Sequence, residues 1–141
     1  MKLNITSLDR AAHFNMELFE VESKYYSSYS FDVSVKNYGY SGSLNNIWID
    51  RDAIEAFLLQ LTELSTSWKG MAILTSMDYK YFTVSIEIVG LKKDIVLNYQ
   101  FVKSIDIGPS MKDIGIYGGF QIEATSLDAI MNYCKKILNC R

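Results

Sequence analysis

The sequence has few of the residue types on which most active sites and metal centres depend. Its 141 residues include one histidine, His13, and two cysteines, Cys134 and Cys140, that lie six positions apart. A catalytic triad or a histidine-rich metal site would have to be built around His13 alone, so a strand histidine without a catalytic role is the better interpretation. The cysteine spacing does not fit a zinc knuckle or a thioredoxin-like motif. We therefore predict no catalytic residue, no metal site and no cofactor.

The sequence also lacks an excess of basic residues, and it lacks long apolar runs. The chain has 14 basic and 16 acidic side chains, for a net charge of -2, whereas a protein that binds nucleic acid normally has a basic face. No apolar run approaches the length that crosses a bilayer. Asn4, Thr6 and Asp9 interrupt the N-terminal segment, which is therefore not typical of a signal peptide. These features predict a cytoplasmic protein with reduced thiols and no direct contact with nucleic acid or membranes.

The composition that remains is that of one globular domain over residues 1–141. Apolar residues make up 49% of the chain and charged residues 21%, close to the averages of soluble domains. Apolar and polar residues alternate over 14–18, 29–36, 82–88 and 95–101, a pattern that predicts half-buried strands. Shorter strands are expected near 44–49 and 71–75, an irregular segment near 104–113, and a last strand over 114–124 in which Gly118-Gly119 predicts a bulge or a bend.

Two segments have the spacing of amphipathic helices, at about 50–67 and 126–139. In the first, Asp50 is the expected N-cap, and Thr125-Ser126-Leu127-Asp128 resembles a capping box before the second. Strands outnumber helices and are joined by short connections. The sequence therefore predicts an α+β fold, with a single antiparallel sheet of about six strands and both helices packed on one face.

The motif Asp50-Arg51-Asp52 has two interpretations. It matches the DxD pattern that can hold a divalent metal on a nucleotide sugar, but carboxylates are also favoured at the positive end of a helix, where backbone N–H groups lack partners. We favour the helix cap.

Tyrosine and serine are concentrated in one part of the sequence. Five of the ten tyrosines fall within residues 25–40, among serines and glycines. Tyrosine buries a large area with few rotatable bonds and retains a hydroxyl, so such a segment can form a protein contact surface; the alternative is that these rings cover the core and the strand ends. The expected contacts are four tyrosines with three neighbouring carboxylates: Glu20, Glu22, Tyr25, Tyr26, Asp32, Tyr38 and Tyr40.

The order of these segments resembles the WapI-type immunity proteins over about residues 15–138. The resemblance rests on Ser43-Leu44-Asn45-Asn46-Ile47-Trp48-Ile49-Asp50 leading into a helix, on Gly70 and the strands after it, and on Phe120-Gln121-Ile122-Glu123-Ala124-Thr125-Ser126-Leu127 leading into the last helix. Trp48, Asp50 and Gly70 match the family's scaffold as structural positions.

The resemblance implies a non-enzymatic bacterial protein that binds and neutralises the C-terminal toxin domain, often a nuclease, of a contact-dependent toxin. It supplies no catalytic residue. The alternative is a small-ligand-binding protein or an unrecognised enzyme with an apolar, tyrosine-lined pocket. The sequence leaves the oligomeric state open.

Overall fold

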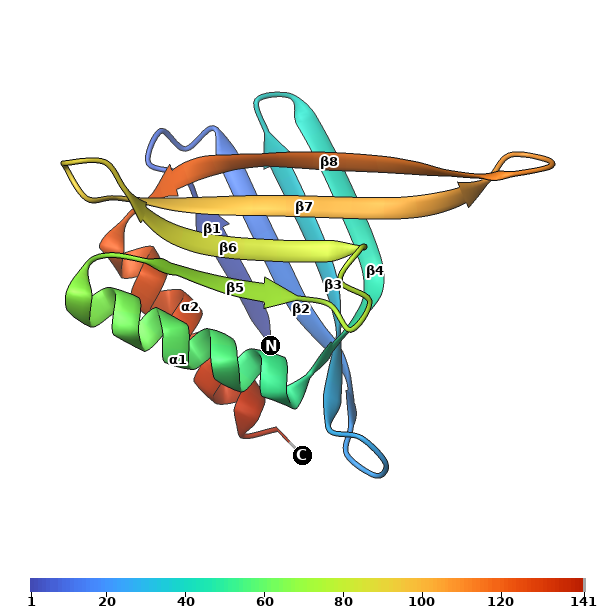
Figure 1. Ribbon diagram of the computed structural model, residues 1–141, viewed down its shortest axis with the longest axis horizontal. Helices are drawn as coiled ribbons and strands as arrows, with labels where there is room; N and C mark the ends of the chain where they lie inside the picture. Colours follow the sequence, from blue (N-terminus) through green and yellow to red (C-terminus); the bar gives the residue numbers. More distant parts are fainter. Residues whose placement is uncertain (141) are drawn as a thin grey trace.

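The chain folds into two four-stranded antiparallel sheets and two helices, in an order that repeats. Four strands and a helix are followed by four more strands and a second helix (Figure 1). The computed structural model describes residues 1–140, so Arg141 of the predicted domain lies outside the described residues. Sheet 1 contains β1 (Lys2–Thr6), β2 (Ala12–Glu22), β3 (Ser28–Asn37) and β4 (Tyr40–Asp50), followed by α1 (Arg51–Ser67); sheet 2 contains β5 (Met71–Thr75), β6 (Phe82–Val89), β7 (Asp94–Asp106) and β8 (Met111–Ile122), followed by α2 (Ala124–Leu138).

The predicted α+β class is confirmed, but the single sheet of about six strands is wrong. Within residues 1–140 every strand pairs only with strands next to it in sequence, and the ladder stops at β4 and starts again at β5, with α1 between them. Alternation of apolar and polar residues shows that a strand has one buried face, but it does not show which strands share a sheet. The prediction also lacked β1, which pairs with β2 from Lys2↔Glu17 to Thr6↔His13.

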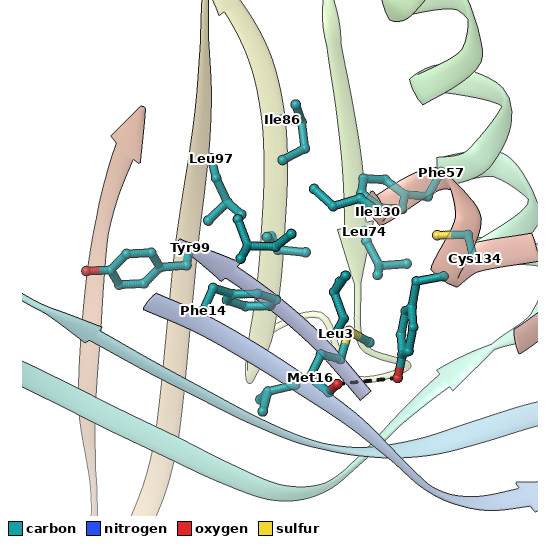
Figure 2. Packing of buried hydrophobic residues seen from close by; sticks show 14 of the residues in the cluster. Leu3, Phe14, Met16, Phe57, Leu74, Ile86, Leu97, Tyr99, Ile130 and Cys134 are labelled. Atoms are coloured by element: carbon teal, nitrogen blue, oxygen red, sulfur yellow. Dashed lines mark hydrogen bonds between the residues drawn. The ribbon is translucent and has the colours of Figure 1, made fainter. Parts of the chain in front are cut away.

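The two sheets pack through their inner faces, and their strands run across one another (Figure 1). Phe14 on β2 lies 6.5 Å from Phe82 and 6.3 Å from Phe101 between ring centroids, so an aromatic cluster joins sheet 1 to sheet 2. Figure 2 shows labelled residues of both sheets and both helices, among them Leu97 and Ile130, converging on this region. The two halves of the chain therefore share one core.

The first helix begins and ends at residues with matching local chemistry. The side chain of Asp50 accepts a hydrogen bond from the Ala53 N–H at 2.6 Å, so the predicted cap is confirmed. At the other end Trp68 adopts a left-handed conformation and its N–H donates to the Leu64 carbonyl at 2.8 Å. The predicted apolar stripe is confirmed as well: Ile54, Phe57, Leu61 and Leu64 are buried.

The capping box predicted for the last helix is wrong. Helix α2 begins at Ala124, before the proposed cap Thr125, and Glu123 at the N-cap position makes no side-chain capping bond. The buried stripe includes Leu127, Ile130, Cys134 and Ile137. Because tertiary packing of an apolar face provides most helical stability in proteins, this helix forms without the cap.

Each helix packs against the first strand of the other half's sheet. Helix α1 lies beside β5, where the Gln60 side-chain oxygen accepts a hydrogen bond from the Ile73 N–H at 2.9 Å. Helix α2 lies against β1, and the Tyr133 hydroxyl donates to the Met1 carbonyl at 3.1 Å. This exchange of helices interlocks the halves.

The segment predicted to be irregular near 104–113 is mostly strand. Strand β7 continues to Asp106 and β8 starts at Met111, so the two form a long hairpin. Strand β6 pairs with β7 only as far as Phe82↔Phe101. The end of the hairpin, residues 102–115, therefore extends beyond β6 as two strands (Figure 1).

The bulge predicted at Gly118-Gly119 is also wrong, because the register of β7 and β8 is continuous from Ile95↔Ile122 to Asp106↔Met111. These glycines make room for side chains of β7. A Cβ atom at Gly118 would lie 2.7 Å from the Tyr99 hydroxyl oxygen, and one at Gly119 would lie 2.5 Å from Asn98 Oδ1.

Among the described residues, no helix has the length and apolarity needed to cross a membrane.

Candidate interaction surfaces

The residues predicted to contact a partner lie in three places. Tyr25 and Tyr26 occupy the loop between β2 and β3, whereas Tyr38 and Tyr40 lie at the opposite end of β3. The strand between them has 10 residues. At about 3.3 Å per residue, the two tyrosine pairs are separated by roughly 30 Å. Closeness in sequence therefore does not bring them into one surface patch.

The first place is the end of β2 and the loop that joins it to β3, residues 19–27, which we call the arm. Strand β1 reaches only Glu17 of β2, so the outer edge of β2 has no strand partner in the arm, whereas on the other side β3 still pairs with β4 as far as Ser28↔Asp50. Tyr25 and Tyr26 expose 83% and 53% of their surface, and Phe19 exposes 66%. The arm thus presents three aromatic rings to solvent.

Sequence reasoning did not include Phe19 in the contact surface. Phe19 lies five residues after the buried Phe14 and three after the buried Met16. An odd spacing places it on the polar face of the strand, and an aromatic residue on that face was the signal available in the sequence. A register shift between Leu18 and Glu20 places Phe19 at a bulge. Bulges change the direction in which a strand aims its side chains.

Acidic side chains shape and surround the tip of the arm. Glu22 Oε1 accepts hydrogen bonds from the backbone N–H groups of Lys24 at 2.7 Å and Tyr25 at 3.4 Å. The Lys24 ammonium lies 5.1 Å from the centre of the Tyr25 ring. Glu20 is exposed on β2 beside Phe19. Of the predicted contacts, Glu20, Glu22, Tyr25 and Tyr26 are therefore brought together.

Asp32 lies in the middle of β3, between the two tyrosine pairs. Its side chain accepts a hydrogen bond from the Asn46 N–H at 2.9 Å, where the β3–β4 register shifts between Phe31 and Val33. Asn46 has a positive φ of 58°, a conformation that asparagine tolerates better than most residues. Asp32 is thus engaged in holding a β-bulge.

The third place is a concavity between the β3–β4 turn and the outer edge of β8, which we call the tyrosine notch. Its volume is about 440 Å³. Tyr40 is 75% exposed and Tyr117, which sequence reasoning missed, is 84% exposed. The lining residues are Asn37, Tyr38, Tyr40, Tyr99, Gly115, Ile116, Tyr117, Gly118 and Gly119.

Side-chain hydrogen bonds fix the walls of the tyrosine notch. Asn37 Nδ2 donates to the Tyr99 hydroxyl oxygen at 3.0 Å and to the Gly119 carbonyl at 3.3 Å, which ties sheet 1 to sheet 2. The Tyr38 hydroxyl donates to Asp9. The hydrogen bonds from Ser7 and then Tyr38 lower the pKa of Asp9 to about 2. Tyr38 is thereby held in one position although it is exposed.

The interior offers little room for a ligand. The core cavity has a volume of about 30 Å³, enough for a single water, whereas pockets for small molecules measure about 300–1,000 Å³. Cys134 lines this cavity, and burial raises the pKa of its thiol to about 12, so the reactive thiolate is disfavoured. His13 is exposed on β2, and its Nδ1 atom forms a hydrogen bond with the Thr6 hydroxyl oxygen at 3.3 Å.

The described part of the chain contains no group of three histidine, cysteine, aspartate or glutamate side chains placed to hold a metal ion.

Comparisons with known proteins add little to this picture. No protein-family model matches the chain, and no curated protein matches it. A solved structure described as that of the plant transcriptional regulator PBF-2 is similar with a TM-score of 0.44 and 9% sequence identity, over 98% of this chain and 79% of that one. A likeness at this level supports no inference about function.

Proposed function

We propose that this protein acts by binding another protein through the arm, as an immunity protein that neutralises the C-terminal toxin domain of a contact-dependent bacterial toxin. The observation that carries the binding role is the arm itself. It places Phe19, Tyr25 and Tyr26 in solvent beside Glu20 and Glu22. Exposed aromatic residues are typical anchors of protein interfaces, and carboxylates steer a basic partner such as a nuclease domain.

The immunity role comes from the resemblance to the WapI-type family and places the protein in the cytoplasm, where it would act without a cofactor. The alternative of a ligand-binding protein or enzyme requires an enclosed pocket. The core cavity of about 30 Å³ does not provide one. The larger concavities, including the tyrosine notch, are open to solvent.

The test compares partner capture by three forms of the tagged protein in a lysate of its source organism. The wild type and a Tyr79→Ala control are expected to retain a stoichiometric C-terminal fragment of a large secreted protein. Tyr79 is a suitable control because it is 77% exposed and lies between β5 and β6, outside the arm. A Tyr25→Ala/Tyr26→Ala variant should bind that fragment at least about 30-fold more weakly, since the loss of even one interface anchor costs about 2 kcal/mol.

Coexpression separates neutralisation from simple binding. The captured fragment should stop growth when produced alone, and the wild-type protein should restore growth. If no such fragment is captured while a metabolite raises the melting temperature, the ligand-binding alternative is supported. Equal capture by the arm variant would contradict the assignment of the arm.

A further inference from the structure

The outer edge of β8 is an unpaired strand edge. Strand β8 is the last strand of sheet 2, and both helices lie toward β5 and β1 (Figure 1). In an antiparallel ladder, alternate residues direct their N–H and C=O groups to opposite sides. The Gln121 carbonyl accepts from the Leu8 N–H and the Gly119 carbonyl from Asn37, which shows that the odd-numbered residues of β8 point to the outer edge.

Further along this edge the polar backbone groups lack protein partners. The described residues give no hydrogen bond to the outward N–H and C=O groups of Asp113, Gly115 and Tyr117. The opposite edge of the same sheet differs, since Gln60 accepts from the Ile73 N–H of β5. An exposed row of unpaired groups is a template for another strand.

We propose that β8 pairs antiparallel with β8 of a second copy of this chain, about a twofold axis at Gly115. This register places Asp113 opposite Tyr117 of the second copy, and all the open groups at Asp113, Gly115 and Tyr117 form about six hydrogen bonds. Sheet 2 of one copy and sheet 2 of the other then become one continuous eight-stranded sheet.

The side chains of β8 are self-complementary in this register. Ile114 of each copy lies opposite Ile116 of the other, so two cross-strand isoleucine pairs form on the face toward sheet 1. Ile114 is 54% exposed in the single chain, and this surface would be covered. Lys112 lies opposite Gly118, so no like charges face each other across the pair.

The tyrosine notch supplies room and support for the second strand. The β3–β4 hairpin extends past β8 in Figure 1, so a strand added at this edge lies over that hairpin as β8 and β7 already do. The notch lies between the hairpin and residues Gly115 to Gly119, where the added strand would run. Tyr40, now 75% exposed, would be covered by it.

Sedimentation of the full chain across the micromolar range tests the proposal. The wild type should sediment as a dimer in equilibrium with monomer. Ile114→Lys places a charge against the isoleucine pair twice per dimer and should raise the dissociation constant at least about tenfold. Leu59→Lys is the matched control, because Leu59 is 62% exposed on α1, which packs against β5 at the opposite edge of sheet 2. Equal melting temperatures of the two variants would show that both remain folded.

Disulfide trapping tests the register. Positions 114 and 116 of the two copies form a non-hydrogen-bonded pair with Cα atoms about 4.5 Å apart, within disulfide reach. An Ile114→Cys/Ile116→Cys protein that also carries Cys140→Ser should therefore form covalent dimers on oxidation. The proposal would be overturned by a wild type that stays monomeric, by an Ile114→Lys protein that dimerises like the wild type, or by the absence of covalent dimers.

Discussion

The two halves of the chain repeat one order of elements but differ in how regular their sheets are. Sheet 1 has register shifts at Leu18/Glu20 and at Phe31/Val33, whereas the three ladders of sheet 2 are continuous. Bulges bend a strand and increase its twist. Irregular pairing therefore changes the direction of side chains within the arm of sheet 1, while regular pairing leaves sheet 2 with a long unpaired strand edge.

The halves are alike in depending on one another for burial. Helix α1 packs on β5 and α2 on β1, and Phe14 of the first half contacts Phe82 and Phe101 of the second. Neither half therefore has a complete core of its own. We expect the halves to unfold together despite the difference between their sheets.

The largest expected effect tests this dependence. Phe14→Ala should lower the free energy of unfolding by about 3–5 kcal/mol, because it removes a buried ring that joins the two sheets. Tryptophan fluorescence from Trp48 and Trp68 reports on the first half, and thiol labelling of the buried Cys134, in a protein that carries Cys140→Ser, reports on the second. The midpoints reported by both probes should shift to the same lower denaturant concentration.

Different midpoints for the two probes would contradict a shared core. The control is Phe19→Ala, which removes an exposed ring and should change the free energy of unfolding by less than about 0.5 kcal/mol.

A smaller effect is expected where the sheets cross. A Cβ atom at Gly42 of β4 would lie 2.7 Å from Ile116 Cγ2 of β8. Gly42→Ala should therefore cost about 1–3 kcal/mol, as overpacking usually does. Adding Ile116→Ala should restore part of this loss, and a double-mutant cycle measures the coupling. Strictly additive losses would show that the two positions do not press on each other.

The two helix starts should differ by a further, smaller amount. Asp50→Ala removes the hydrogen bond to the Ala53 N–H and should cost about 1 kcal/mol. Glu123→Ala at the start of α2 removes no capping bond and should change stability by less than about 0.5 kcal/mol. Chemical denaturation of both variants provides the measurement. Equal losses would mean that the two helices start in the same way.

The smallest effect concerns the turns of sheet 1, which side chains tie together. The pKa of Asp9 is lowered from 3.8 to about 2 in the folded chain. Its ionised form therefore contributes stability above about pH 4, and this contribution is lost as the pH falls through about 2. A carboxyl NMR titration should show the pKa rising in Ser7→Ala and, by less, in Tyr38→Phe. An unchanged titration in both variants would contradict these hydrogen bonds.

Local signals in the sequence were sufficient for the elements that depend on local chemistry. The spacing of Ile54, Phe57 and Leu61 and the capping residue Asp50 predicted α1, and alternation over 82–101 predicted the β6–β7 hairpin. Division into two sheets could not be predicted in this way, because it depends on which buried faces meet. The continuation of the β7–β8 hairpin over 104–113 was missed because Gly108 and Pro109 indicate a break in a strand, and here they form the tight connection between two paired strand ends.

The candidate contacts were predicted from local composition, which carries no information on the distances between residues in the folded chain. Tyrosine enrichment over 25–40 drew attention to both ends of β3 but could not show that they are far apart. Phe19 and Tyr117 were missed because each lies outside that enriched segment. Tyr117 joins Tyr38 and Tyr40 only through the crossing of the sheets.

The packing of α2 against β1 also has a consequence for the chain while it is being synthesised. Strand β1 leaves the ribosome before the helix against which it packs, so it stays without this partner until α2 has been made. Helix α1, in contrast, finds its partner β5 directly after it in the chain. A nascent chain stalled before Ala124 should therefore bind chaperones through β1, and continued synthesis through α2 should end that binding.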